Sequence, residues 1–373
     1  MPSSGPEAEL WMGAHPSGSS RLLRGGVTAT LAEVIASDST RELGATVASA
    51  FDSRLPFLLK VLAASAPLSL QAHPSAVQAR EGFDREERLG IPVDAPHRNY
   101  KDASHKPELI CALTPFEALC GFRRISDTLA LFDALGVSEL DATLAPLRWA
   151  DTAAGLSATL HAIMTKPEPA RSEMVDAVVA ACAAYEGPFR AECQWAVRLE
   201  RLYPGDPGVV TALLLNLVHL EVGEAIYLGA GNLHAYLDGV GVEIMASSDN
   251  VLRGGLTPKH VDLDELLRVL EFVDGPILPL RAWRVDEDEE VWDTPAREFR
   301  LSRLSVRGRR VSRAVSGPEI LLCVGGAVQI DVPDGPAVAL KQGAAAFVPG
   351  SSGSYGLSGT GVVFRATVGA LQA

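Results

Sequence analysis

The sequence predicts a mainly β protein with α-helices, in which a helical segment separates two β-rich parts. Apolar residues recur at helical spacing from about Ile125 to Leu220, between glycine and proline stops. From about Phe299 onward, short runs of valine and leucine alternate with Gly, Pro and Asp turns. Short strands at that spacing are typical of a jelly-roll sandwich or barrel. A length of 373 residues suits two or three domains.

Turn and cap signals divide the helical segment into four or more helices. Ser126-Asp127 should cap a helix that ends before Gly136. Asp206-Pro207 has the form of an N-cap followed by proline at the first helical position. We expect the apolar faces of these helices to form the core of the segment itself.

Two short β segments show a weak internal sequence similarity. Glu224–Leu228 and Ala345–Val348 each lie between a glycine and a tight turn that contains glycine. Two copies of one β-unit would explain this pattern. The acidic run Asp286–Glu290 lies between them and is expected to be a solvated linker or loop.

Composition and charge exclude several classes of protein. Hydrophobic residues make up 47% of the chain, so wholesale disorder is excluded. A net charge of −13 argues against a nucleic-acid or anionic-membrane partner, because both need a basic face. No apolar run approaches the roughly 18 residues needed to cross a bilayer, and residues 1–10 hold no secretory signal. The five cysteines form no C-x-x-C pair and indicate reduced, mostly buried thiols in a cytosol.

The histidines restrict where a metal could bind. All eight lie at or before His260, so the C-terminal β-rich part cannot build a histidine site. Gln71 and His73 are two residues apart, and on a strand they would project from one face. An amide oxygen and an imidazole nitrogen can form half of a divalent-metal shell. A polar strand end before the Pro74 turn is the plainer explanation of this segment alone.

Two further segments can complete such a shell. In the segment 100–108, Glu108 is a candidate ligand, and Lys106 beside a cation would have a lowered pKa and could act as a base. A surface loop is the alternative. The glycine turn 229–231 would deliver His234 to the inner face of a β-barrel. The four side chains together form an N₂O₂ set that suits zinc, and also manganese, iron or cobalt; they are Gln71, His73, Glu108 and His234.

A fourth segment supplies positive charge. Arg253 precedes two glycines, so it can be held rigidly while the backbone passes close to a ligand. A phosphate would need a local basic pocket in so acidic a protein, and Arg253, Lys259, Lys106 and Lys60 could form it. The Arg-Gly-Gly sequence is by itself compatible with an ordinary solvent loop.

Together these segments resemble the type I phosphomannose isomerase family, nearly from end to end. The matching motifs occur in order; they are residues 9–13 and 15–16, 55–62, 67–74, 100–108, 234–236 and 248–259. Two departures are visible. Ser75 stands where the family often has aspartate, and Ser104 stands where it often has asparagine. Neither departure removes a candidate ligand.

The resemblance implies a zinc enzyme that interconverts mannose 6-phosphate and fructose 6-phosphate. It implies two cupin-type (jelly-roll) β-domains: a catalytic one formed by residues 1–115 and 221–265, and a non-catalytic C-terminal one at 266–373. Residues 116–220 would form an inserted α-helical domain. One zinc ion per chain would be held by Gln71, His73, Glu108 and His234. The remaining pocket residues would be Trp11, Lys60, Ser69, Lys106, Tyr236, Glu243, Arg253 and Lys259.

The implied reaction moves a proton between C2 and C1 through a cis-enediol. Zinc and Arg253 would stabilise the developing negative charge, and His105 or Lys106 would serve as the acid or base of ring opening. Lys106, Glu243 and a zinc-bound hydroxide are all reasonable bases for the C2 proton. The alternatives are a metal-dependent cupin oxygenase and a non-catalytic sugar-binding cupin. We expect a cytoplasmic monomer that acts on a small sugar phosphate.

Overall fold

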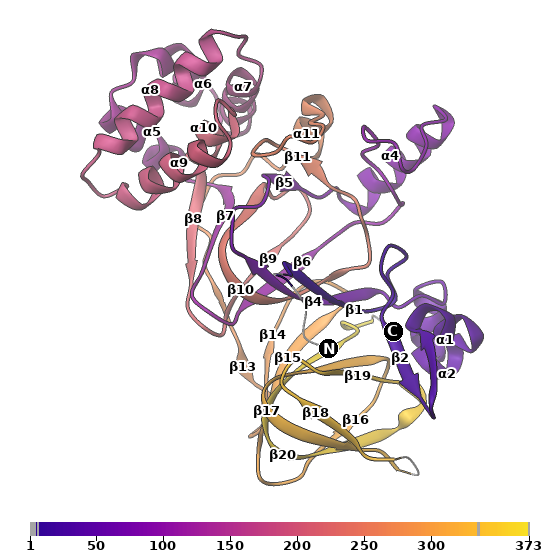
Figure 1. Ribbon diagram of the computed structural model, residues 1–373. Helices are drawn as coiled ribbons and strands as arrows, with labels where there is room; N and C mark the ends of the chain where they lie inside the picture. The colour runs from indigo at the N-terminus through magenta and orange to yellow at the C-terminus, as the bar shows by residue number, and fades with distance from the viewer. Residues whose placement is uncertain (1–4, 6, 334–335, 372–373) are drawn as a thin grey trace.

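The computed structural model describes residues 5, 7–333 and 336–371. Figure 1 shows two β-bodies packed against each other, with a cluster of helices at the far end of the first body. Among the described residues, no helix is both long and apolar enough to cross a bilayer. Residues 1–4 and 6, part of the stretch expected to hold no secretory signal, lie outside the described residues.

The first β-body is a strongly bent antiparallel sheet built around one long strand, β10 (His234–Ala246). Residues 239–246 of β10 pair with β4 and residues 241–245 with β6, whereas residues 234–238 pair with β7 and His234 with β5. The strand turns at Gly239, where φ is +120° and a Cβ atom would lie 2.7 Å from the Pro115 carbonyl oxygen. The other strands are β1 (Glu9–Met12), β4 (Phe57–Ala64), β5 (Gln71–Ala72), β6 (Glu108–Ala112), β7 (Phe116–Phe122), β8 (Leu215–Leu220), β9 (Glu224–Leu228), β11 (Leu252–Arg253) and β12 (Leu280–Arg281).

Strand alternation gives this sheet an apolar outer face and a partly charged inner face. Leu109 of β6 and Val242 and Ile244 of β10 belong to the core that joins the two β-bodies. The residues between them on each strand, such as Ile110, point the opposite way and form the inner core. Glu108 and Glu243 share that inner face, so the register of β6 and β10 determines where the charges lie.

The helical segment lies between β7 and β8, which pair with each other. Its helices are α5 (Ile125–Leu135), η1 (Ser138–Leu140), α6 (Asp141–Trp149), α7 (Thr152–Met164), α8 (Ala170–Ala184), α9 (Arg190–Leu202) and α10 (Gly208–Ala212). Their buried apolar residues form a shared core, but this core also contains buried residues of the first β-body such as Leu70 and Leu237. The expectation that the segment has a core of its own is therefore wrong in part. The helices and the two strands that flank them lie within 116–220, the range expected for the inserted domain. The domain boundaries themselves stay a prediction.

The predicted start of the first of these helices is wrong, and its predicted end is confirmed. Helix α5 begins at Ile125, and no side chain at Ser126-Asp127 caps it. The Ile125 N–H instead donates to Asp274 Oδ2 at 2.8 Å, a residue distant in sequence. The helix ends at Leu135, and Gly136 follows in the left-handed conformation.

The remaining helices lie outside the inserted cluster. They are α1 (Leu31–Ser37), α2 (Ser39–Leu43), α3 (Ala45–Ala50), α4 (Ala76–Arg88), α11 (Leu263–Val269) and the short η2 (Gly350–Ser352). A hairpin of β2 (Arg21–Arg24) and β3 (Val27–Thr30) precedes α1. Helix α4 follows His73 directly, with Ser75 as its N-cap in a capping box with Gln78.

The second β-body repeats the pairing scheme of the first. Its strands are β13 (Trp283–Arg284), β14 (Glu289–Trp292), β15 (Arg300–Arg307), β16 (Val311–Ala314), β17 (Glu319–Asp331), β18 (Val338–Lys341), β19 (Ala345–Val348) and β20 (Ser354–Thr367). Strand β20 lies between β15 and β17 as β10 lies between β4 and β6. Strands β9 and β19 pair with β6 and β17 respectively, so the two glycine-flanked segments occupy equivalent places in a repeated unit.

The expectation of a solvated linker or loop at Asp286–Glu290 holds for Asp286 and Glu287, which are exposed in the loop between β13 and β14, but it is wrong for Glu289. Strand β14 begins at Glu289, and the Glu289 side chain is only 9% exposed. Its carboxylate lies 3.1 Å from Arg365 Nη1 and 2.9 Å from Arg313 Nε. Arginines from distant strands therefore compensate an acidic run that looks solvated in the sequence.

Candidate metal centre and substrate cavity

Three predicted ligands from separate segments converge at one buried point. His73 follows β5, Glu108 begins β6 and His234 begins β10. The atoms that they offer to a metal all lie within 4.8 Å of one another. His73 and His234 are fully buried, and Glu108 is 2% exposed. This cluster confirms the predicted convergence of the three side chains.

Backbone carbonyls determine which nitrogen of each histidine faces the centre. His73 Nδ1 lies 2.8 Å from the Asn250 carbonyl oxygen, and His234 Nδ1 lies 3.0 Å from the Asn232 carbonyl oxygen. A carbonyl only accepts, so each Nδ1 carries the proton and each Nε2 directs a lone pair at the centre. Burial lowers the pKa of His73 to about 4, so its ring is neutral near pH 7.

The donor set fits a divalent cation. His73 Nε2, Glu108 Oε2 and His234 Nε2 are buried without a hydrogen-bond partner, and they face one another. The two Nε2 atoms lie 3.3 and 3.6 Å from the oxygens of Glu108. An unpaired buried polar group is costly, at about 1–3 kcal/mol, whereas these three atoms are ordinary zinc ligands. Their common direction is therefore explained by a shared metal ion.

Gln71 lies beside this cluster. Its backbone pairs with His234 on one side and Arg253 on the other, and it lines the same cavity as Glu108. Its role as a fourth ligand stays a prediction.

Lys106 keeps Glu108 ionised. Burial by itself would raise the pKa of Glu108, but the Lys106 ammonium lies 3.0 Å from Oε1 and helps to hold that pKa well below its ordinary range. Pro107 separates the two residues, and the extended chain places both side chains on one face. A carboxylate that stays negative at neutral pH is a suitable metal ligand.

A polar cavity of about 340 Å³ opens above the cluster. Nine of the predicted site residues line it: Lys60, Ser69, Gln71, Lys106, Glu108, Tyr236, Glu243, Arg253 and Lys259. Sequence reasoning missed Glu9 and Tyr203, which also line it. Glu9 lies two residues before Trp11 on β1. Residues two apart on a strand point to the same face, so the predicted role of Trp11 could have indicated Glu9 as well. Tyr203 follows α9, and its hydroxyl donates to the Pro67 carbonyl oxygen at 3.0 Å.

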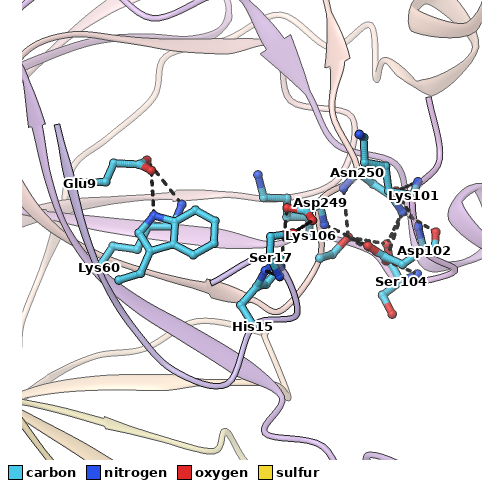
Figure 2. Close-up of polar contacts among 12 residues, drawn as sticks. Glu9, His15, Ser17, Lys60, Lys101, Asp102, Ser104, Lys106, Asp249 and Asn250 are labelled. Atoms are coloured by element: carbon cyan, nitrogen blue, oxygen red, sulfur yellow. Dashed lines mark hydrogen bonds and ion pairs between the residues drawn. The ribbon is translucent and has the colours of Figure 1, made fainter. Parts of the chain in front are cut away.

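Lys60 is held between two carboxylates, as Figure 2 shows in part. Its Nζ lies 3.2 Å from Glu243 Oε2 and 3.5 Å from Glu9 Oε1. Burial by itself would lower the pKa of Lys60, but these carboxylates raise it above its ordinary value. The Trp11 indole donates to Glu9 at 2.8 Å, and its ring lies 4.9 Å from the ammonium. Trp11 therefore supports Lys60 from outside the cavity lining.

Glu243 is the second buried carboxylate of the inner face. Tyr236 donates its hydroxyl hydrogen to Glu243 Oε1 at 3.0 Å. Burial raises the pKa of Glu243, although the Lys60 ammonium opposes the shift. Burial also raises the pKa of Tyr236 well above its ordinary value, so the phenol stays protonated.

The other end of the cavity carries uncompensated positive charge. Within the described ranges, neither Arg253 nor Lys259 has a carboxylate partner within ion-pair distance. Arg253 lies on β11 and is half-buried, and burial lowers its pKa.

The loop after Arg253 needs glycine at position 255. Gly255 has φ +114°, and a Cβ atom there would lie 2.9 Å from Gly208 Cα. Any larger residue would push this loop away from α10.

His105 is not among the residues that line the cavity. Its Nε2 lies 2.9 Å from Glu298 Oε1, a residue that precedes strand β15 of the second β-body. The sequence placed His105 by its proximity to Lys106, but neighbouring residues on an extended chain point to opposite sides. The structure brings it to the contact between the two β-bodies.

The fold and the site together define a cupin-type protein with a candidate metal centre. Residues 1–125 match the family described as phosphomannose isomerase type I, catalytic domain. The chain is 38% identical to the mannose-6-phosphate isomerase of Salmonella typhimurium over 367 residues, or 98% of this chain and 92% of that protein. It therefore belongs to the type I phosphomannose isomerase family.

Further relatives support the same assignment. The mannose-6-phosphate isomerase of Homo sapiens is 33% identical, over 92% of this chain and 84% of that protein. A solved structure described as mannose 6-phosphate isomerase (holo; zinc bound) superposes with a TM-score of 0.91 at 37% identity. That comparison covers 98% of this chain and 92% of the other.

Proposed function

We propose that this protein is a zinc-dependent isomerase that interconverts mannose 6-phosphate and fructose 6-phosphate. The observation that carries the proposal is the set of three unpartnered buried ligand atoms beneath a polar cavity, on His73, Glu108 and His234. Membership of the family and the similarity to a zinc-bound relative support the choice of zinc. A bound zinc ion, with Gln71 as a proposed fourth ligand, would polarise the sugar oxygens near C1 and C2.

Two side chains of the cavity are candidates for moving the C2 proton. Lys106 and Glu243 both line the cavity, and both are buried. Glu243 has a raised pKa, and Lys60 and Tyr236 bond its two oxygens. A carboxylate whose pKa is raised is a stronger base than an ordinary one, and it can both accept and return a proton. The Lys106 ammonium forms an ion pair with Glu108 and has no lone pair to accept a proton, so we propose Glu243 as the preferred base.

The unpaired cations suit an anionic substrate. A phosphate placed near Lys259 and Ser69 would compensate the charge of Lys259, which no carboxylate of the described residues compensates. Lys60 was also expected to contact the substrate, but its ammonium already contacts Glu9 and Glu243. We therefore propose that Lys60 positions those carboxylates toward the sugar. Arg253 is the proposed donor to oxygens that become negative during the reaction.

The proposal includes a cytoplasmic, monomeric enzyme. All five cysteines are free and buried, which suits a reducing compartment.

The deciding experiment measures zinc and turnover on the same purified sample. Elemental analysis should give about one zinc per chain, and a coupled assay should detect fructose 6-phosphate formed from mannose 6-phosphate. Zinc-loaded protein that binds the sugar without converting it would instead indicate a non-catalytic sugar-binding cupin. Iron in place of zinc, with oxygen consumption on substrate addition, would indicate an oxygenase.

A further inference from the structure

One side chain connects two of the segments that carry metal ligands. Asn250 is fully buried and precedes β11. Its carbonyl oxygen lies 2.8 Å from His73 Nδ1, across 177 residues of sequence. This carbonyl holds the His73 ring in the tautomer and orientation that direct Nε2 at the centre. The position of the Asn250 backbone therefore sets the position of a ligand.

The Asn250 amide uses all of its hydrogen-bonding capacity on one loop, residues 101–104, as Figure 2 shows. Its Oδ1 accepts from the backbone N–H groups of Lys101 at 2.7 Å and Asp102 at 3.3 Å. Its Nδ2 donates to the carbonyl oxygens of Asp102 at 2.7 Å and Ser104 at 2.9 Å. No conformational freedom remains for a side chain with both donors and both lone pairs engaged.

Two neighbours strengthen the same connection. The Asp102 carboxylate accepts from the Ser248 hydroxyl at 2.9 Å and from the Asp249 N–H at 2.9 Å. The Asp249 carboxylate in turn accepts from the Ser17 hydroxyl at 2.9 Å. Residues 101–104 lead directly into Lys106 and Glu108, so the network fixes the approach to a second ligand.

We propose that Asn250 is a positioning residue for the metal centre, which sets the spacing between His73 and Glu108. The inference rests on the proposed function, because it assumes a metal that is needed for turnover. Aspartate has the same shape but no donor. At position 250 it would place negative charge against the Asp102 and Ser104 carbonyls and within 3.4 Å of the Asp102 carboxylate. The amide, rather than the size of the side chain, is what the site requires.

The test compares the zinc affinity of Asn250→Asp and Asn250→Ala with that of the wild type, by competition with a chromophoric chelator. We expect both variants to raise the Kd for zinc by about 10–100-fold, the usual effect of removing a partner of a metal ligand. The control is Asn216→Ala. The Asn216 amide also binds backbone carbonyls, including those of Phe122 and Gly275, but has no recorded contact with a proposed ligand among the described residues.

Thermal melting separates positioning from general stability. Zinc raises Tm by an amount that grows with its affinity. Asn216→Ala should lower Tm of the zinc-free and zinc-loaded proteins equally, whereas the Asn250 variants should also shrink the increment that zinc adds. An unchanged zinc Kd in Asn250→Asp would overturn the inference, even if Asn250→Ala fails to fold. Because zinc Kd is measured without sugar, an inactive wild type that binds zinc would overturn the proposed function alone.

Discussion

Replacing Arg365 with alanine should destabilise the second β-body strongly and leave turnover unchanged. Glu319, the first residue of β17, is 1% exposed, and Arg365 Nε lies 2.7 Å from its Oε2. Tyr355 donates its hydroxyl hydrogen to the same oxygen at 2.9 Å. Without Arg365, this buried carboxylate would keep only the phenol as a partner among the described residues.

The register explains why this ion pair exists. Glu319 pairs with Val348 as Glu108 pairs with Leu228, so the two glutamates occupy equivalent positions in the repeated unit. The second β-body has no histidine to hold a metal there. The guanidinium of Arg365 supplies the positive charge that a metal would supply beside Glu108.

The size of the expected stability loss follows from the burial of the ion pair. Removing one partner of a buried ion pair costs about 3–5 kcal/mol, because the remaining charge stays desolvated. Arg310, on the same β-body, contacts Asp331 at 2.9 Å, but the two side chains are 57% and 28% exposed. Such an exposed pair contributes about 0.2–1 kcal/mol. Arg310→Ala is therefore the matched control.

Urea unfolding followed by fluorescence measures the free energies of unfolding of the two variants. Arg365→Ala should lose several times more stability than Arg310→Ala. The kcat of Arg365→Ala should equal that of the wild type well below its Tm, because no residue of β14–β20 lines the cavity. Equal stability losses in the two variants would refute the reasoning.

Three further predictions concern the site itself. His234→Ala should lose zinc and isomerase activity together, and a metal-free preparation that stays active would contradict this. Lys259→Ala should lower kcat/KM for mannose 6-phosphate about 10- to 150-fold while leaving that for mannose unchanged, since a charged hydrogen bond contributes about 1.5–3 kcal/mol; equal losses on both sugars would exclude a phosphate contact. Arg253→Ala should lower kcat by about 10²–10³ with KM and zinc content maintained. A steep rise in KM with kcat preserved would make Arg253 a phosphate clamp.

The sequence by itself determined the order of β and helical parts and the identity of three candidate ligands that converge in the structure. Helical periodicity, glycine stops and alternation are local properties of the chain, so they predict elements such as the end of α5 before Gly136. His73, Glu108 and His234 were found because ligand chemistry depends on residue type, and because their motifs resemble those of one family.

The tertiary structure decided which charges compensate one another. Lys60 lies between Glu9 and Glu243, His105 contacts Glu298, and Asn250 connects the loop before Glu108 to His73. Each contact joins strands or loops that are distant in the chain. Periodicity shows which face a side chain occupies but not which strand will pair beside it, because pairing depends on burial across the whole sheet. The partners of the charged residues were therefore decided only by the assembled fold.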